Sequence, residues 1–152
     1  MSSSPVDVGI SEFIKTSLET LSDEFPNAYL LLCTQLTFRT VLLVVDREKV
    51  AMTFDPRGAH ILQQLRNPAV QLYTTRQTIL DIIDARLTLH EAVLTDAILL
   101  QGAVGDLAAF HDGLLTYVRG AVRCPSFPAL LDRFRYTATM LLHGDDEANT
   151  RQ

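Results

Sequence analysis

The run Val41-Leu42-Leu43-Val44-Val45 constrains the fold more than any other feature of this chain. An unbroken apolar run of this length, rich in β-branched residues, is typical of a strand that is covered on both faces. Flanking runs at 28–38 and 50–54 mix polar and apolar residues, as half-buried strands do. The joint at 46–49 is short and charged, which suits a hairpin turn. The first half of the chain therefore predicts a meander of antiparallel strands.

Helical patterns surround these strands. Before them, apolar residues follow the spacing of an amphipathic helix, with Ser17 as the interruption and Pro26-Asn27 as the end. The residues of that stripe are Ile10, Phe13, Ile14, Leu18, Leu21 and Phe25. After the break at 55–58, residues 59–66 predict a short helix that Asn67-Pro68 ends.

The second half alternates strands and helices. Residues 70–74 and 97–104 predict a fourth and a fifth strand. Between them lie a helical stripe from Ile79 to Ile83 and a capping box formed by Thr88 and Glu91. The last third carries two further helical stripes, separated by Pro125 and Pro128 and ending near Leu141. The predicted class is α+β, with a five-stranded, mostly antiparallel sheet covered by helices.

The chain has 152 residues, which predicts a single domain large enough to hold an internal cavity. We expect that domain at 10–143, after a mobile arm at 1–9 and before a polar tail at 144–152. The net charge of −5 argues against nucleic acid as a partner. The longest charge-free stretch, 25–38, is too short to span a bilayer, so we expect no integral membrane segment and a cytoplasmic location.

The residues that could carry chemistry do not form a recognisable catalytic set. Cys33 and Cys124 predict reduced, buried thiols, and no pattern in the sequence predicts a metal or a cofactor. His111 beside Phe110 either points into a cavity or is a semi-buried histidine bonded to backbone. Asp81 and Asp84 share a helix face, which is more often solvated than catalytic. Four arginines lie close together near the C-terminus: Arg119, Arg123, Arg133 and Arg135. They either bind a lipid head group or form the solvent-exposed face of the terminal helices.

Apolar residues make up 47% of the chain and charged residues only 20%. Without a catalytic set or a membrane segment to account for it, this apolar excess forms either a dense core or the wall of a hydrophobic ligand site.

The run from Gln77 to Gly102 resembles the sterol carrier protein 2 family. Ala85-Arg86-Leu87 stands where members have a Gly-x-Leu-like element, and Ala92 and Gly102 match later positions. Ala85 replaces the usual glycine, and Asp96-Ala97 stands where members often have Gly-Lys. The resemblance implies a sheet and helices around an apolar tunnel. It also implies binding of sterols, fatty acyl chains or other lipids without metal, without cofactor and usually without catalysis.

Carried onto this sequence, the resemblance implies a tunnel wall and a lid from the C-terminal helix that contains Leu130, Leu131 and Leu141. The candidate ligand-binding residues are Ile79, Ile82, Ile83, Leu89, Leu94, Leu99, Phe110, His111, Leu114, Phe134 and Met140.

Three hypotheses on function remain open at this point. The first is non-catalytic lipid carriage or transport. The second is an interaction module with a filled tunnel, which would form a homodimer through an apolar face. The third is a small cavity enzyme, such as a cyclase or an isomerase, which would need His111 or His90 inside the cavity with a carboxylate in reach.

Overall fold

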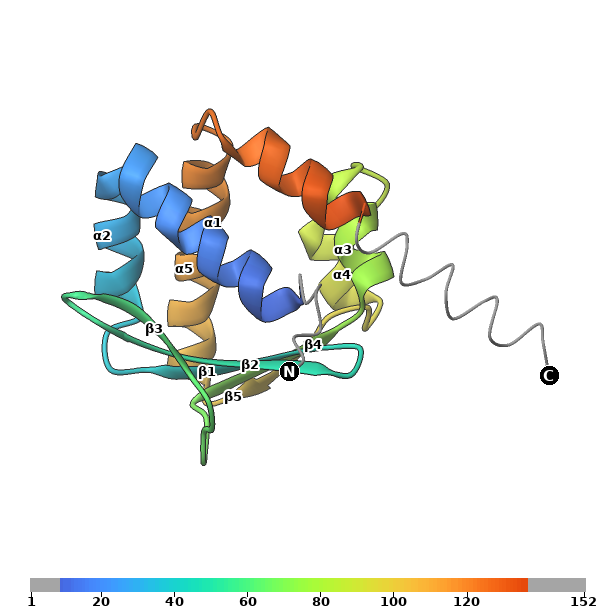
Figure 1. Ribbon diagram of the computed structural model, residues 1–152. Helices are drawn as coiled ribbons and strands as arrows, with labels where there is room; N and C mark the ends of the chain where they lie inside the picture. The colour runs from blue at the N-terminus through green and yellow to red at the C-terminus, as the bar shows by residue number, and fades with distance from the viewer. Residues whose placement is uncertain (1–8, 137–152) are drawn as a thin grey trace, which may run out of the picture.

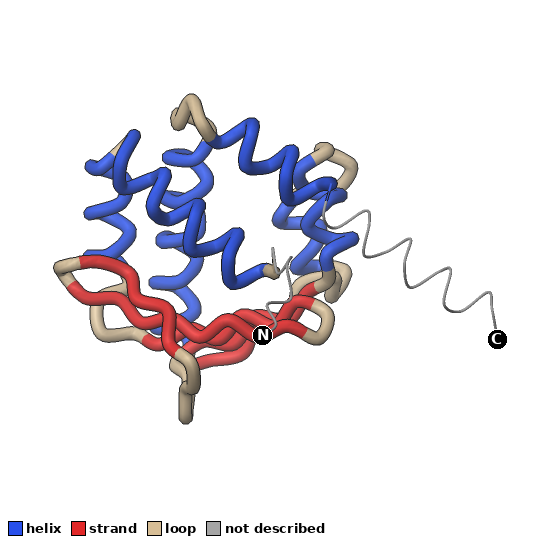
Figure 2. The backbone as a smooth tube through the Cα atoms, viewed as in Figure 1, coloured by secondary structure: helices blue, strands red, loops and turns tan. Residues whose placement is uncertain are grey.

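The computed structural model describes residues 9–136. One sheet lies under a layer of helices, and all the helices lie on the same face of the sheet (Figures 1 and 2). The elements are α1 (Ile10–Glu24), α2 (Pro26–Gln35), β1 (Thr40–Val45), β2 (Glu48–Asp55), β3 (Gly58–Leu62), β4 (Val70–Thr74), α3 (Arg76–Ile83), α4 (Leu89–Leu94), β5 (Leu99–Gly102) and α5 (Val104–Ala121). Residues 127–136 are also helical and are called the covering segment below.

The sheet has five strands in the order β3-β2-β1-β4-β5. β1 pairs antiparallel with β2 and parallel with β4, and the two outer pairings are antiparallel. The predicted α+β class and the mostly antiparallel, five-stranded sheet are confirmed. The parallel pair arises because the chain passes from β3 at one edge to β4 beyond β1.

β1 lies at the centre of the sheet, but it is not covered on both faces as its unbroken apolar run predicts. Val41 and Val45 are buried beneath the helices, whereas Leu42 and Val44 on the other face are only partly buried. Side chains alternate along a strand, and here the helices cover one face only.

The prediction of a strand over 28–38 is wrong, because these residues form most of α2. Pro26 lies at the first helical position, where a residue needs no N–H donor, so it begins this helix as well as ending α1. Ala28 and Leu32 are buried one helical turn apart, yet Leu30 and Leu31 on the outer side are about half exposed. Apolar residues therefore surround the helix on all sides, and the sequence lacks the period that would identify it.

The prediction of a helix over 59–66 is also wrong. Asp55 Oδ1 accepts the backbone N–H groups of Arg57 at 2.7 Å and Gly58 at 3.1 Å, which closes a hairpin turn. The next residues form β3, in which Ala59 and Ile61 pair with β2. Cross-strand pairing outweighs the helical propensity of this segment. The strand count is correct because β3 replaces the strand that was predicted at 28–38.

The other helices follow their sequence patterns. The capping box is present, with Glu91 N–H donating to Thr88 Oγ1 at 3.0 Å and Thr88 N–H donating to Glu91 Oε1 at 3.3 Å. Ser17, which interrupts the first apolar stripe, is fully buried, and its hydroxyl donates to the Ile14 carbonyl at 2.8 Å. That bond within α1 satisfies a polar group that would otherwise be costly to bury.

Of the three predicted chain regions, the arm at 1–9 and the tail at 144–152 lie outside the described residues, apart from Gly9. Among residues 9–136, no helix is both long and apolar enough to cross a bilayer.

Candidate ligand-binding site

Seven of the eleven candidate residues face the apolar interior between the sheet and the helices. Phe110 of α5 and Phe134 of the covering segment belong to the buried core, and Phe134 is only 3% exposed. The other five are partly buried and pack against that core: Ile79, Ile82, Ile83, Leu89 and Leu114. Residues from α3, α4, α5 and the covering segment thus converge on one apolar region.

Three candidates lie at the surface instead, which corrects their assignment to an enclosed wall. Leu94, the last residue of α4, is 69% exposed, and Leu99 is 47% exposed. Leu99 pairs with Tyr73, so it points to the open face of the sheet, while the neighbouring Leu100 points to the helices. The side chain of His111 is 64% exposed, because it follows the buried Phe110 by one helical position. The last candidate, Met140, lies outside the described residues.

The exposure of His111 bears on the cavity-enzyme hypothesis. The carboxylate near it is that of its neighbour Asp112, with 3.7 Å between Nδ1 and Oδ1. His90, the other histidine that this hypothesis could use, is also exposed. Neither imidazole is enclosed, so the arrangement that this hypothesis requires of His111 or His90, inside a cavity with a carboxylate in reach, is not present.

The covering segment is attached at three places. Ser126, directly before it, donates its backbone N–H to Glu24 Oε1 at 2.9 Å, and its hydroxyl bonds Glu24 Oε2. These bonds lower the pKa of Glu24 below its ordinary value of 4.5. Near the other end, the rings of Phe134 and Phe13 pack with centroids 4.7 Å apart. The third attachment is an ion pair between Arg135 and Asp84, at 2.6 Å. The segment therefore joins α1 to the end of α3, over the apolar region.

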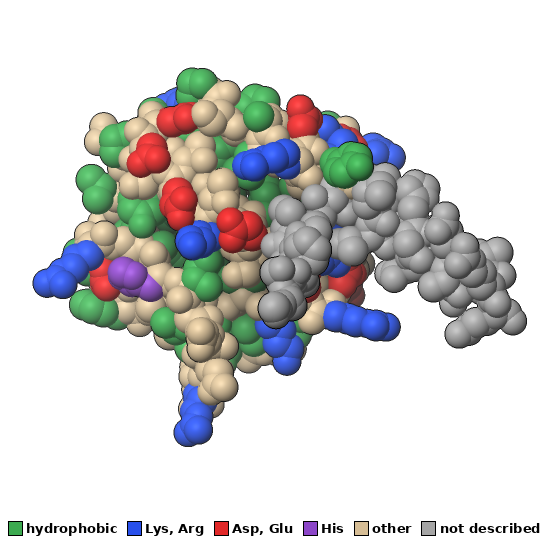
Figure 3. All heavy atoms as spheres, viewed as in Figure 1, with side chains coloured by type: hydrophobic (Ala, Val, Ile, Leu, Met, Phe, Trp, Pro, Cys, Tyr) green, Lys and Arg blue, Asp and Glu red, His purple; other side chains and the backbone are tan. Residues whose placement is uncertain are grey.

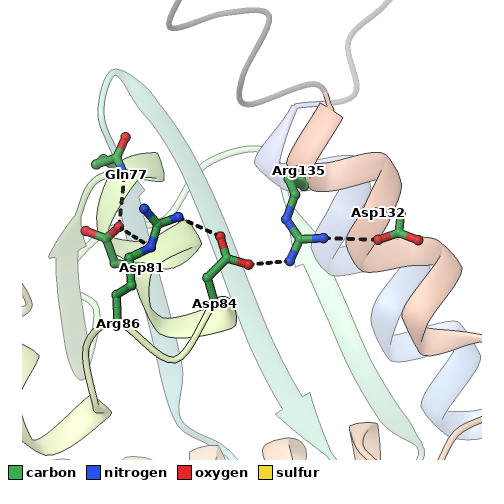
Figure 4. A network of polar contacts seen from close by, with 6 residues as sticks. All are labelled: Gln77, Asp81, Asp84, Arg86, Asp132 and Arg135. Atoms are coloured by element: carbon green, nitrogen blue, oxygen red, sulfur yellow. Dashed lines mark hydrogen bonds and ion pairs between the residues drawn. The ribbon is translucent and has the colours of Figure 1, made fainter.

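Figure 4 shows the charged network at this third attachment. Asp84 accepts hydrogen bonds from Arg86 at 2.8 Å and from Arg135, and Arg135 also bonds Asp132 at 3.1 Å. The bond from Arg86 is the largest cause of the lowered pKa of Asp84, followed by the bond from Arg135. Asp81 accepts a bond from Gln77 at 3.0 Å. Both carboxylates are thus engaged in polar contacts, but only Asp84 holds the covering segment to α3, because the partners of Asp81 are Gln77 and Arg86.

The other three arginines of the C-terminal group lie on the outer surface. Arg123 lies over the ring of Phe25, with 5.6 Å to its centroid, in the geometry of a cation–π contact. Arg119 and Arg133 are exposed. The arginines therefore do not converge on one head-group site, as one of the two sequence interpretations would require.

A concave region lies between α1 and β3, and the sequence analysis missed it because β3 was predicted as a helix. This groove has a volume of about 860 Å³. Its lining residues are Ser11, Glu12, Lys15, Leu18, Glu19, Ser22, Asp23, Tyr29, Ala59, His60 and Ile61. Figure 3 shows acidic side chains gathered over α1 on this face, with a histidine at the side.

Metal-ligand chemistry has no support in residues 9–136, where no group of three or more suitable side chains comes together. Cys33 and Cys124 are both free and buried, and burial raises the pKa of each thiol.

Comparison by sequence finds no matching protein-family model and no matching curated protein. Comparison by structure does find similar proteins. A protein described as "UbiJ-SCP2 Ubiquinone synthesis protein" has a TM-score of 0.55 and 14% identity, over 76% of this chain and 95% of its own. A sterol carrier protein 2 has a TM-score of 0.51 and 16% identity, over 75% of this chain and 96% of its own.

The chain has the sterol carrier protein 2 fold. A Thermus thermophilus protein described as possibly a sterol carrier protein also has this fold, with a TM-score of 0.52, 15% identity, and coverage of 78% and 90% of the two chains. The predicted resemblance is therefore confirmed at the level of the fold. At these identities the shared sterol carrier protein 2 fold does not carry the function with it.

Proposed function

We propose that this chain binds and carries a hydrophobic ligand, such as a sterol, a fatty acyl chain or another lipid, between its sheet and its helices. One observation carries the proposal. Large aliphatic side chains from α3, α4 and α5 pack against the same apolar core and remain only partly buried. Ligand sites have this character, with apolar walls and few polar groups. The names of the proteins with the same fold, which include a sterol carrier protein, support it.

Burial of apolar surface would drive binding. A twelve-carbon chain gains about 10 kcal/mol at about 0.8 kcal/mol per CH₂ group. Association costs several kcal/mol of that gain, so we expect a micromolar dissociation constant. In this proposal no residue of the described chain acts as a catalyst, and the ligand is bound and released unchanged.

The first test is displacement of a dansyl-labelled fatty acid from delipidated full-length protein, together with native mass spectrometry of gently purified protein. We expect saturable binding of the probe and a retained lipid mass. If neither fatty acids, sterols nor isoprenoids bind, the proposal is wrong.

Leu114→Trp separates an open interior from a filled one. If the interior holds a ligand, the indole occupies part of that space, so probe affinity falls at least about tenfold while stability changes little. If side chains already fill it, overpacking costs about 1–3 kcal/mol of unfolding free energy. Val122→Trp is the matched control, because Val122 directly follows the same helix and is exposed.

The interaction-module hypothesis is the other outcome of this test. It requires a destabilised Leu114→Trp variant, no probe binding, and a dimer in sedimentation of the unmodified chain.

A further inference from the structure

The strand β3 forms one edge of the sheet. Ala59 donates its backbone N–H to the hydroxyl of Tyr29, at 2.9 Å, rather than to β2. In an antiparallel pair, successive residues direct their N–H groups alternately toward and away from the partner strand. Ile61, two residues beyond Ala59, therefore also directs its N–H and C=O outward. Within residues 9–136, no backbone hydrogen bond from another element reaches that edge at Ile61.

Tyr29 occupies the place that a carbonyl of a further strand would take beside Ala59. Its approach depends on Gly58, because a Cβ atom there would lie 2.8 Å from the Tyr29 hydroxyl oxygen. The tyrosine from α2 thus covers one end of the edge and leaves the other end free. Covering an edge in this way limits uncontrolled strand pairing.

The free part of the edge opens into the groove between β3 and α1. Three carboxylates and one ammonium group from exposed positions of α1 line it: Glu12, Glu19, Asp23 and Lys15. His60, on the strand side, is held by Asp55, with 3.0 Å between Nε2 and Oδ2. The helical wall is therefore net negative, and Figure 3 shows this acidic face.

We propose that the groove binds an extended segment of a partner protein, which adds to β3 as a further strand and directs lysine or arginine side chains toward α1. A groove between a helix and a free strand edge is a recurrent mode of peptide recognition, in which main-chain bonds give affinity and side-chain pockets give specificity. The three carboxylates supply the charge complementarity that selects basic side chains. The volume of about 860 Å³ is in the range of ligand sites and accommodates a short peptide.

This inference is independent of the lipid proposal, because none of the candidate ligand-binding residues from the sequence analysis lines the groove. Either proposal, lipid binding or peptide binding, can therefore be wrong while the other is correct.

The probe is a fluorescein-labelled hexapeptide that alternates arginine or lysine with valine, titrated into ¹⁵N-labelled full-length protein. We expect amide shifts in β3 and along the groove side of α1, and slower hydrogen exchange at the Ile61 amide. A second peptide carries N-methyl groups on the alternate amides that would pair with β3, and a third has glutamate at the basic positions. Both should bind at least about tenfold more weakly, since one loses its backbone donors and the other its charge complementarity.

Two protein variants complete the test. Ile61→Pro removes the outward N–H, a change that an edge strand tolerates, and should lower affinity at least about tenfold, whereas Ile61→Val should not. The triple variant Glu12→Gln, Glu19→Gln, Asp23→Asn should weaken binding and flatten its salt dependence. If Ile61→Pro does not fold, the triple variant still tests the proposal.

The proposal is overturned if the first peptide causes no shifts in β3 at about 1 mM, a concentration that detects even weak complexes. It is also overturned if the N-methylated peptide binds as well as the first, since the attraction would then be electrostatic only.

Discussion

The guanidinium of Arg135 lies 2.6 Å from Asp84 Oδ1 and so joins the covering segment to the end of α3. Both side chains are partly exposed, and exposed ion pairs contribute little to global stability. Their position matters more than their strength, because the pair closes one end of the segment over the apolar interior.

Arg135→Gln should therefore leave the unfolding transition nearly unchanged and make amides of the covering segment exchange severalfold faster. Hydrogen exchange measured by mass spectrometry on residues 127–136 tests this, since local opening does not require global unfolding. Arg133→Gln, an exposed arginine of the same segment, is the control and should change neither quantity. An equal effect from both variants would contradict a specific role for the Arg135–Asp84 pair.

Phe134→Ala should destabilise the protein by about 3–5 kcal/mol, because it leaves a cavity where a buried ring packs against Phe13. Chemical denaturation monitored by circular dichroism measures this. Tyr136→Ala removes an exposed ring two residues later and should change stability by less than about 0.5 kcal/mol. A small loss for Phe134→Ala would mean that the covering segment is not part of the cooperative fold.

Substitution by alanine at two glycines of α5 should change the free energy of unfolding in opposite directions. At Gly120 an added Cβ atom would lie 2.6 Å from Leu21 Cδ1 and 2.9 Å from the Ala28 Cβ atom, so Gly120→Ala should cost about 1–3 kcal/mol through overpacking. At Gly105 nothing lies within 4 Å, so Gly105→Ala should stabilise the helix by about 0.5–1 kcal/mol. Thermal unfolding of both variants tests the pair. A Gly120→Ala variant that is as stable as the unmodified chain would contradict the close packing of α5 on α1 and α2.

The attachment of Ser126 to Glu24 should make stability depend on acid pH. Its hydrogen bonds lower the pKa of Glu24 in the folded chain below the ordinary 4.5. A lowered folded pKa means that the contribution is complete above the unfolded value and is lost as pH falls through the folded value. Unfolding measured from pH 7 downward should therefore show a loss below about pH 4.5 that is smaller in Glu24→Gln. The same acid profile in the variant and the unmodified chain would contradict this assignment.

Capping of α4 offers a local test. Thr88→Ala removes the acceptor for the Glu91 N–H and should cost about 1 kcal/mol. Thr88→Ser keeps that acceptor and should cost much less. Equal losses from the two variants, measured by denaturant unfolding, would contradict a capping role for the hydroxyl.

The sequence by itself determined the features that depend on near neighbours along the chain. The capping box of Thr88 and Glu91, the helical stripe of Ile79, Ile82 and Ile83, and the central strand at Val41–Val45 could all be predicted, because their signals lie within a few residues. Phe110 and Phe134, which the resemblance assigned to the ligand site, are buried in the apolar core.

Only the tertiary structure decided which residues beyond that pattern come together. The β3 strand exists because residues 58–62 pair with β2, and α2 has apolar residues on every side, so neither element could be predicted from local periodicity. The outward positions of His111 and Leu99 depend on which face the helices cover, and a shift of one residue changes the face. The groove between α1 and β3 joins segments about forty residues apart along the chain, and its existence follows from the packing of the whole sheet against its helices.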